Sequence, residues 1–308
     1  MPSLPFASLP PAVRIVEVGP RDGLQNESAR IATPDKIAFV DRLTDAGLPV
    51  IEVSAFVSPK WVPQMADAVE VFKGIRRKPG VRYTALVPNL AGLARAREAA
   101  VDEIAIFAAA SETFSRTNIN QSIEESLHTY RQVCDAARQD GVPVRGYLST
   151  CFGCPFEGPV SPERVAELSA RLLDLGVYEV SVSDTIGIAH PGQVPDVLER
   201  VFQRVPRERV ALHFHDTRGT ALANVLVGLQ MGVATFDASA GGLGGCPYAP
   251  GATGNLATED LIYMLNGLGI ETGVSLPALV DASAFIEPRL DHRLPSRYAQ
   301  AARAAQKK

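Results

Sequence analysis

Strand-like and helix-like segments alternate along almost the whole chain, and this alternation restricts the fold more than any other feature. Eight short apolar runs are each followed by a polar loop and a helical pattern. The predicted strands are Arg14–Val18, Val50–Ser54, Tyr83–Val87, Glu103–Phe107, Val144–Ser149, Glu179–Ser183, Val210–His215 and Thr235–Ala238. Eight such units without a break in composition favour one α/β domain, a (β/α)8 barrel. A doubly wound open sheet is the structural alternative, but it usually has fewer strands and a glycine-rich first turn.

Helix signals and loop lengths support the barrel and locate its functional end. Thr33-Pro34 begins a helix that ends at Gly47, and Ser122 begins another with a capping box that includes Glu125. Connections from strand to helix are long and rich in glycine, proline and polar residues, whereas the return connections are short. The long loops of a barrel meet at the C-terminal end of its strands, where barrel active sites lie. We assign residues 1–275 to the catalytic barrel and 276–308 to a helical extension packed on it.

Composition excludes several classes of protein. The 308 residues carry a formal net charge of −4, which argues against a nucleic-acid surface. No apolar run approaches the roughly 18 residues that a membrane span needs. The N-terminal residues have no basic region followed by an apolar run, so we expect no secretory signal. Four cysteines are too few for a disulfide framework, and we therefore expect a cytoplasmic protein.

Two of the five histidines lie in one predicted strand. Residues two apart on a strand project to the same face, so His213 and His215 lie side by side at the C-terminal end of the seventh strand. Asp22 follows the first strand, which is separated from the seventh only by the eighth, and its carboxylate completes a set suited to a divalent metal. The alternatives are a pair of hydrogen-bonded core histidines and a local salt bridge between Arg21 and Asp22.

Further polar residues surround this predicted metal site. A cation at Arg21 beside a metal requires an anion between them, which suggests substrate or the charge that develops on it. Glu17 and Glu52 lie among apolar neighbours near the ends of the first two strands. Because buried carboxylates need partners, we expect both to brace Arg21 or an imidazole N–H. Glu52 acting as a base is a second interpretation.

The segment from 241 to 255 contains six glycines and is adaptable enough for an active-site lid. Within it, Cys246 is interpreted as an acid or base or as a spectator. A phosphate cradle is a weaker interpretation because no Walker lysine follows. Asn255 offers a neutral oxygen ligand or caps the next helix. The single pair Cys151 and Cys154 is interpreted as structural or mildly redox-sensitive.

Several motifs together resemble the 3-hydroxy-3-methylglutaryl-CoA (HMG-CoA) lyase family, from about residue 13 to residue 273. The motifs are residues 16–27 (VEVGPRDGLQNE), 58–65 (SPKWVPQM), 118–125 (NINQSIEE), 213–216 (HFHD) and 242–249 (GLGGCPYA). The glycine–cysteine loop is the most specific of them. The Arg-Asp and His-x-His pairs alone indicate only the wider superfamily of metal-dependent aldolases and Claisen-type synthases on a TIM barrel.

The resemblance implies carbon–carbon lyase activity on an acyl-CoA thioester, with Mg²⁺ or Mn²⁺ as the cofactor. It implies a metal site formed by Asp22, His213, His215 and Asn255. Arg21 would then lie at the thioester carbonyl, Cys246 would act as acid or base, Glu52 would support the site, and Asp22 or a histidine would relay a proton. The family's positions near the substrate correspond to Asn118, Tyr147, Ser181, Asp184 and Thr185.

The chain departs from the family pattern at Ser28, where family members carry a lysine. Whether this position contacts a phosphate of the substrate is therefore open, and Arg30 is the alternative residue for that contact. A condensing synthase of the same superfamily is the nearest alternative function, although such synthases carry a large C-terminal domain. A non-catalytic barrel with a structural zinc is a second alternative, but closed zinc sites prefer four ligands with cysteines. We expect a homo-oligomer, a dimer or higher.

Overall fold

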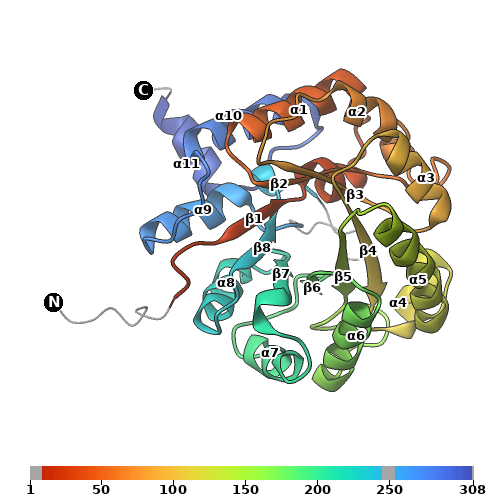
Figure 1. Ribbon diagram of the computed structural model, residues 1–308. Coiled ribbons are helices and arrows are strands. Elements are labelled where there is room, and N and C mark those ends of the chain that lie inside the picture. The colour runs from red at the N-terminus through yellow and green to blue at the C-terminus, as the bar shows by residue number, and fades with distance from the viewer. Residues whose placement is uncertain (1–8, 245–253, 307–308) are drawn as a thin grey trace.

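The computed structural model describes residues 9–244 and 254–306. Within them, eight parallel strands form a closed barrel in which each strand pairs with the next one in the sequence (Figure 1). The strands are β1 Arg14–Glu17, β2 Val50–Ala55, β3 Arg82–Leu86, β4 Glu103–Ala109, β5 Val144–Ser149, β6 Val180–Asp184, β7 Val210–Phe214 and β8 Thr235–Ala238. Pairing of β8 with β1 closes the barrel. The predicted fold class is confirmed, and the predicted strand ends differ from the observed ones by at most two residues.

Helices surround the barrel as an outer layer (Figure 1). They are α1 Thr33–Asp45, α2 Ala68–Gly74, α3 Leu90–Glu98, α4 Glu112–Ile119, α5 Ile123–Gln139, α6 Pro162–Asp174, α7 Val194–Phe202, α8 Ala221–Gln230, α9 Thr258–Gly267, α10 Leu276–Ile286 and α11 Arg297–Gln306. The predicted capping box begins α5, where the Ser122 hydroxyl accepts from Glu125 N and the Glu125 carboxylate accepts from Ser122 N. In the described ranges, no helix is both long enough and apolar enough to cross a membrane.

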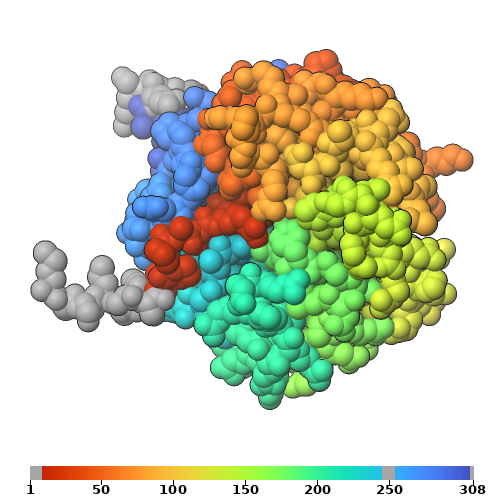
Figure 2. All heavy atoms as spheres, viewed as in Figure 1, coloured from red at the N-terminus to blue at the C-terminus, as the bar shows by residue number. Residues whose placement is uncertain are grey.

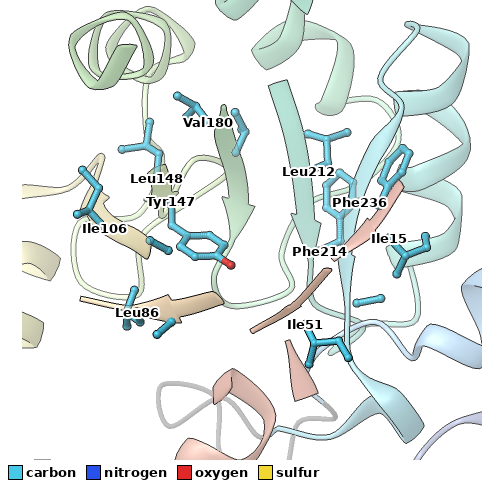
Figure 3. Close-up of a cluster of buried hydrophobic side chains, with 14 of the residues drawn as sticks. Ile15, Ile51, Leu86, Ile106, Tyr147, Leu148, Val180, Leu212, Phe214 and Phe236 are labelled. Carbon is cyan, nitrogen blue, oxygen red and sulfur yellow. The ribbon is translucent and has the colours of Figure 1, made fainter. Parts of the chain in front are cut away.

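Successive side chains of each strand point in opposite directions. One set packs in the core between the barrel and the helices, and the other set fills the interior of the barrel. On β7, Leu212 packs toward α8, so closely that a Cβ on Gly228 would lie 2.5 Å from Leu212 Cδ1. On β5, Tyr147 points into the barrel whereas the neighbouring Leu148 points away from it (Figure 3). Residues of odd number on β7 therefore face the interior, which places His213 there.

The C-terminal helices pack against the first and last parts of the barrel. Contacts join α10 to α1 and α9, and α11 to α9. In the space-filling view, the C-terminal residues in blue lie against the N-terminal part of the barrel in red and orange (Figure 2). The predicted C-terminal helices are thus confirmed.

Candidate active site

A single π-helical turn, η1 (Gly19–Gly23), follows β1 directly and carries Arg21 and Asp22. The Val18 carbonyl accepts hydrogen bonds from the backbone N–H groups of Arg21, Asp22 and Gly23 at 3.2, 2.7 and 3.1 Å. Three donors on one carbonyl hold the turn tightly against the end of the strand. Both side chains are therefore fixed at the C-terminal mouth of the barrel.

Asp22 meets His213 and His215 at this mouth. One potential ligand atom from each residue lies within 4.8 Å of those of the other two. The two imidazole rings are 5.1 Å apart between centroids, and both histidines are buried. The predicted convergence of these three side chains on one point is confirmed.

Asn255 joins the same cluster because the returning glycine-rich segment pairs with the end of β7. His215 and Asn255 form an isolated antiparallel bridge. Asn255 Nδ2 donates to Asp22 Oδ2 at 2.9 Å and to the Leu243 carbonyl at 3.1 Å, while its buried Oδ1 has no donor among the described residues. The helix-capping interpretation is wrong, because Ala257 is the N-cap of α9 and no side chain caps that helix end.

Close backbone approach at Gly244 makes room for Asn255. A Cβ at Gly244 would lie 2.7 Å from Asn255 Nδ2, and the Gly244 φ of +109° is in a region that L side chains rarely adopt. Cys246, two residues further along, lies outside the described residues.

The charge states of Asp22 and His215 suit a divalent cation. For His213, burial is outweighed by the neighbouring Asp237 and Asp22, which raise the pKa. Burial would raise the pKa of Asp22, but Arg21 and the two histidines outweigh it and lower that pKa to about 2. Burial and the neighbouring His213 lower the pKa of His215 to about 3, so this imidazole is neutral at physiological pH. One carboxylate, two imidazoles and an amide oxygen without a donor together form a donor set for a divalent metal.

Arg21 is buried between two carboxylates. Its Nε donates to Glu52 Oε2 at 2.5 Å and its Nη1 to Asp22 Oδ1 at 2.6 Å. The guanidinium carbon lies 5.4 Å from the centre of the Tyr147 ring. Asp22 therefore forms the salt bridge with Arg21 and also belongs to the cluster with the two histidines, so these two interpretations do not exclude each other. The expected contact between Glu52 and Arg21 is also present.

The expectation that Glu17 braces Arg21 or an imidazole is wrong. Its Oε1 accepts from the backbone N–H groups of Gly19 and Ala240, each at 2.8 Å, and its Oε2 accepts from Thr258 Oγ1 at 2.7 Å. Burial outweighs these hydrogen bonds and raises the pKa of Glu17 to about 7. Glu17 instead ties the turn after β1 to the segment after β8 and to the start of α9.

Sequence reasoning missed Asp237 and Arg145, which lie in the barrel interior below the histidines. Asp237 Oδ2 is 3.4 Å from His213 Nδ1 and accepts from Ser181 Oγ at 2.7 Å. Arg145 Nη2 donates to Asp237 Oδ1 at 2.7 Å, and Arg145 Nε donates to Glu179 Oε1 at 2.8 Å. The available signal was a single charged residue, at an inward position, in each of two strands.

A cavity of about 880 Å³ opens beside the cluster. Its lining includes Arg21, Asp22, Asn118, Tyr147, Thr185, His213 and His215, with Trp61 and Arg116 also in its wall. Ser181 and Asp184 are not among the lining residues. Ser181 bonds to Asp237, and the Asp184 carboxylate accepts from Ile188 N and Ala189 N at 2.9 and 3.0 Å.

Other residues singled out in the sequence lie away from the cluster. Cys151 and Cys154 are free and buried, and Cys154 Sγ lies 2.9 Å from Ser111 Oγ, as the structural interpretation expects. Ser28 and Arg30 line a second cavity of about 280 Å³, which shares Trp61 with the first.

These features define a class: a parallel barrel enzyme with a candidate divalent-cation site and a buried guanidinium at the mouth of a deep cavity. Residues 12–286 match the HMGL-like family model. The chain is 56% identical over 294 residues to the mitochondrial hydroxymethylglutaryl-CoA lyase of Bos taurus, covering 96% of this chain and 90% of that one. This chain belongs to the HMGL-like family.

Solved structures agree with this assignment. A crystal structure of hydroxymethylglutaryl-CoA lyase from Pseudomonas aeruginosa superposes with a TM-score of 0.95 at 56% identity, covering 97% of this chain and 99% of that one. An HMG-CoA lyase from Acinetobacter baumannii, in complex with coenzyme A and 3-methylmalate, superposes with a TM-score of 0.90 at 40% identity, covering 94% and 95%.

The cluster predicts how one ligand substitution changes metal binding. His215→Ala should weaken Mn²⁺ binding by more than the roughly 10- to 100-fold that loss of an outer partner of a ligand typically costs. Titration of the metal-free protein with Mn²⁺, followed by electron paramagnetic resonance, measures this. His292→Ala is the matched control, because the exposed His292 belongs to a second candidate group, with Glu27 and Asp291. Weaker binding in the control and unchanged binding in His215→Ala would contradict the site.

Proposed function

We propose that this chain cleaves HMG-CoA to acetyl-CoA and acetoacetate by a metal-assisted retro-Claisen reaction. The single observation that carries the proposal is the convergence of Asp22, His213 and His215 beside the buried Arg21 at a deep cavity. The similarity to named lyases over almost the whole chain supports it.

The proposed cofactor is Mg²⁺ or Mn²⁺, held by Asp22, His213, His215 and Asn255. When bound, such an ion lowers the pKa of a substrate hydroxyl and fixes the substrate oxygens. The oxygen and nitrogen donors suit a hard or borderline cation, and the Asn255 oxygen without a donor fits a ligand role.

Bond cleavage requires a proton to leave the C3 hydroxyl and an electron pair to move from the C2–C3 bond onto the thioester. In the proposed scheme, Asp22 accepts the hydroxyl proton, and Arg21 offsets the negative charge that develops on the thioester oxygen. Glu52 holds the guanidinium in place through its 2.5 Å hydrogen bond. Cys246 then protonates C2, which gives acetyl-CoA.

The cavity of about 880 Å³ is the proposed binding site of the acyl-CoA thioester. Asn118, Tyr147 and Thr185 line it and are proposed to contact substrate. Ser181 and Asp184 are not part of the cavity lining, so we propose that they act by holding Asp237 and the segment after β6. Location in the cytoplasm and assembly as a homo-oligomer stay predictions, which cell fractionation and light scattering can test.

The direct test of this function is product release. Purified protein should release acetoacetate and acetyl-CoA from HMG-CoA, lose this activity in excess EDTA, and recover it with Mg²⁺ or Mn²⁺. Full activity in EDTA, with no metal found by elemental analysis, would rule out the metal-assisted reaction. Condensation of acetyl-CoA with a 2-oxo acid, without cleavage of HMG-CoA, would favour a synthase instead.

The proposed role of Arg21 predicts a loss in kcat with little change in KM, because its interaction strengthens only as charge develops. Arg21→Met should lower kcat on the order of 10² to 10³, as loss of one such donor typically does. Arg21→Lys keeps the charge without the planar fork and should recover part of the rate. Steady-state kinetics with metal content measured in parallel decides this. A large rise in KM at unchanged kcat would contradict the role.

The proposed role of Cys246 predicts that Cys246→Ser keeps metal binding and loses most of kcat. Alkylation of the parent chain should occur at Cys246, because the other cysteines are buried, and it should inactivate the protein. Bound substrate should protect Cys246 from alkylation. Burial also raises the pKa of Cys134 to about 11, which keeps that thiol unreactive. Cys134→Ser is the control and should remain sensitive to alkylation. Normal turnover by Cys246→Ser would make the residue a spectator.

A further inference from the structure

Asp237 on β8 lies beside His213 on β7, and the two residues are partners in the parallel register. Both Asp237 oxygens are already engaged. Oδ2 faces His213 Nδ1 at 3.4 Å and accepts from Ser181, while Oδ1 accepts from Arg145. Asp237 is buried and does not line the large cavity. Any part it plays in the reaction is therefore exerted through a neighbour.

That neighbour is His213, and the contact determines which ring nitrogen carries a proton. At 3.4 Å this contact does not meet hydrogen-bond geometry, but the negative charge of Asp237 attracts an N–H on Nδ1 and repels a lone pair there, which favours Nδ1 as the N–H nitrogen of the ring. A neutral imidazole with its proton on Nδ1 has its lone pair on Nε2. Metal-ligating histidines commonly donate their other N–H to a carboxylate in this way.

Arg145 fixes the orientation of the Asp237 side chain toward His213. The guanidinium is a donor without an acceptor, so the atom that faces Arg145 Nη2 must be an oxygen. Arg145 is buried, and its other carboxylate partner is Glu179, which also pairs with Arg14. Both Glu179 and Asp237 thus neutralise Arg145, whereas of the two Asp237 is the one that lies beside the histidine.

We propose that Asp237 is a positioning residue that holds His213 with its proton on Nδ1, so that Nε2 is available to a cation bound with Asp22 and His215. Arg145 and Ser181 hold Asp237 in turn. The inference rests on the cation site of the proposed function.

The decisive variant is Asp237→Asn, in which Arg145 also controls the orientation of the new amide. The amide oxygen must face Arg145, so the NH₂ group faces His213 and donates to Nδ1, which moves the imidazole proton to Nε2. Mn²⁺ affinity of the metal-free protein should fall on the order of 10- to 100-fold, the usual effect of losing such a partner. Glu179→Gln removes the same charge from Arg145 without touching His213, and it should keep the affinity of the parent chain.

A second measurement does not depend on either variant folding. In the Mg²⁺-loaded parent protein labelled with ¹⁵N-histidine, the His213 signal, assigned through its loss in His213→Asn, should report a proton on Nδ1. A His213 proton on Nε2 would overturn the proposal. So would equal losses of affinity in Asp237→Asn and Glu179→Gln, or parent affinity in Asp237→Asn. A parent chain that binds no Mn²⁺ would instead overturn the cation site itself, and with it this inference.

Discussion

The buried guanidinium of Arg21 is the group on which the arrangement of the site depends. Removing a charge from water is costly unless partners compensate it, and Arg21 meets this requirement with Glu52 on one side and Asp22 on the other. Because Asp22 shares its carboxylate between Arg21 and Asn255, a cation bound at the candidate site would complete a connected set of polar and charged groups. Burial strengthens each of these interactions, and it also makes the loss of any one member costly.

Segments far apart in the sequence are held together by buried carboxylates that do not line the cavity. Glu17 joins the turn after β1 to the segment after β8, and Asp237 joins β8 to β5 and β7 through Arg145 and His213. The barrel supplies strands in fixed register, and these buried side chains set the position of the loops and rings at its mouth. Such support is what a site needs if its donors are to be in place before the reaction begins.

Periodicity and loop length were enough to predict the barrel, because each strand and helix carries its own local signal. The same-face rule also placed His213 and His215 together, and strand order placed Asp22 beside them. The partners of buried charges were harder to predict. Glu17 and Glu52 have similar sequence contexts, yet only Glu52 reaches Arg21, because which partner a buried carboxylate meets depends on the three-dimensional packing of loops. Asp237 was missed since its strand offers only four residues of pattern.

The central claim is that Asp22, His213 and His215 hold the catalytic cation at the mouth of the barrel. The most direct test is the anomalous scattering of a crystal soaked with Mn²⁺, because it locates the ion without reference to activity. The account predicts one strong peak within bonding distance of all three side chains. A peak only at the second group, Glu27, Asp291 and His292, or no peak in crystals of protein that is active with Mn²⁺, would contradict it.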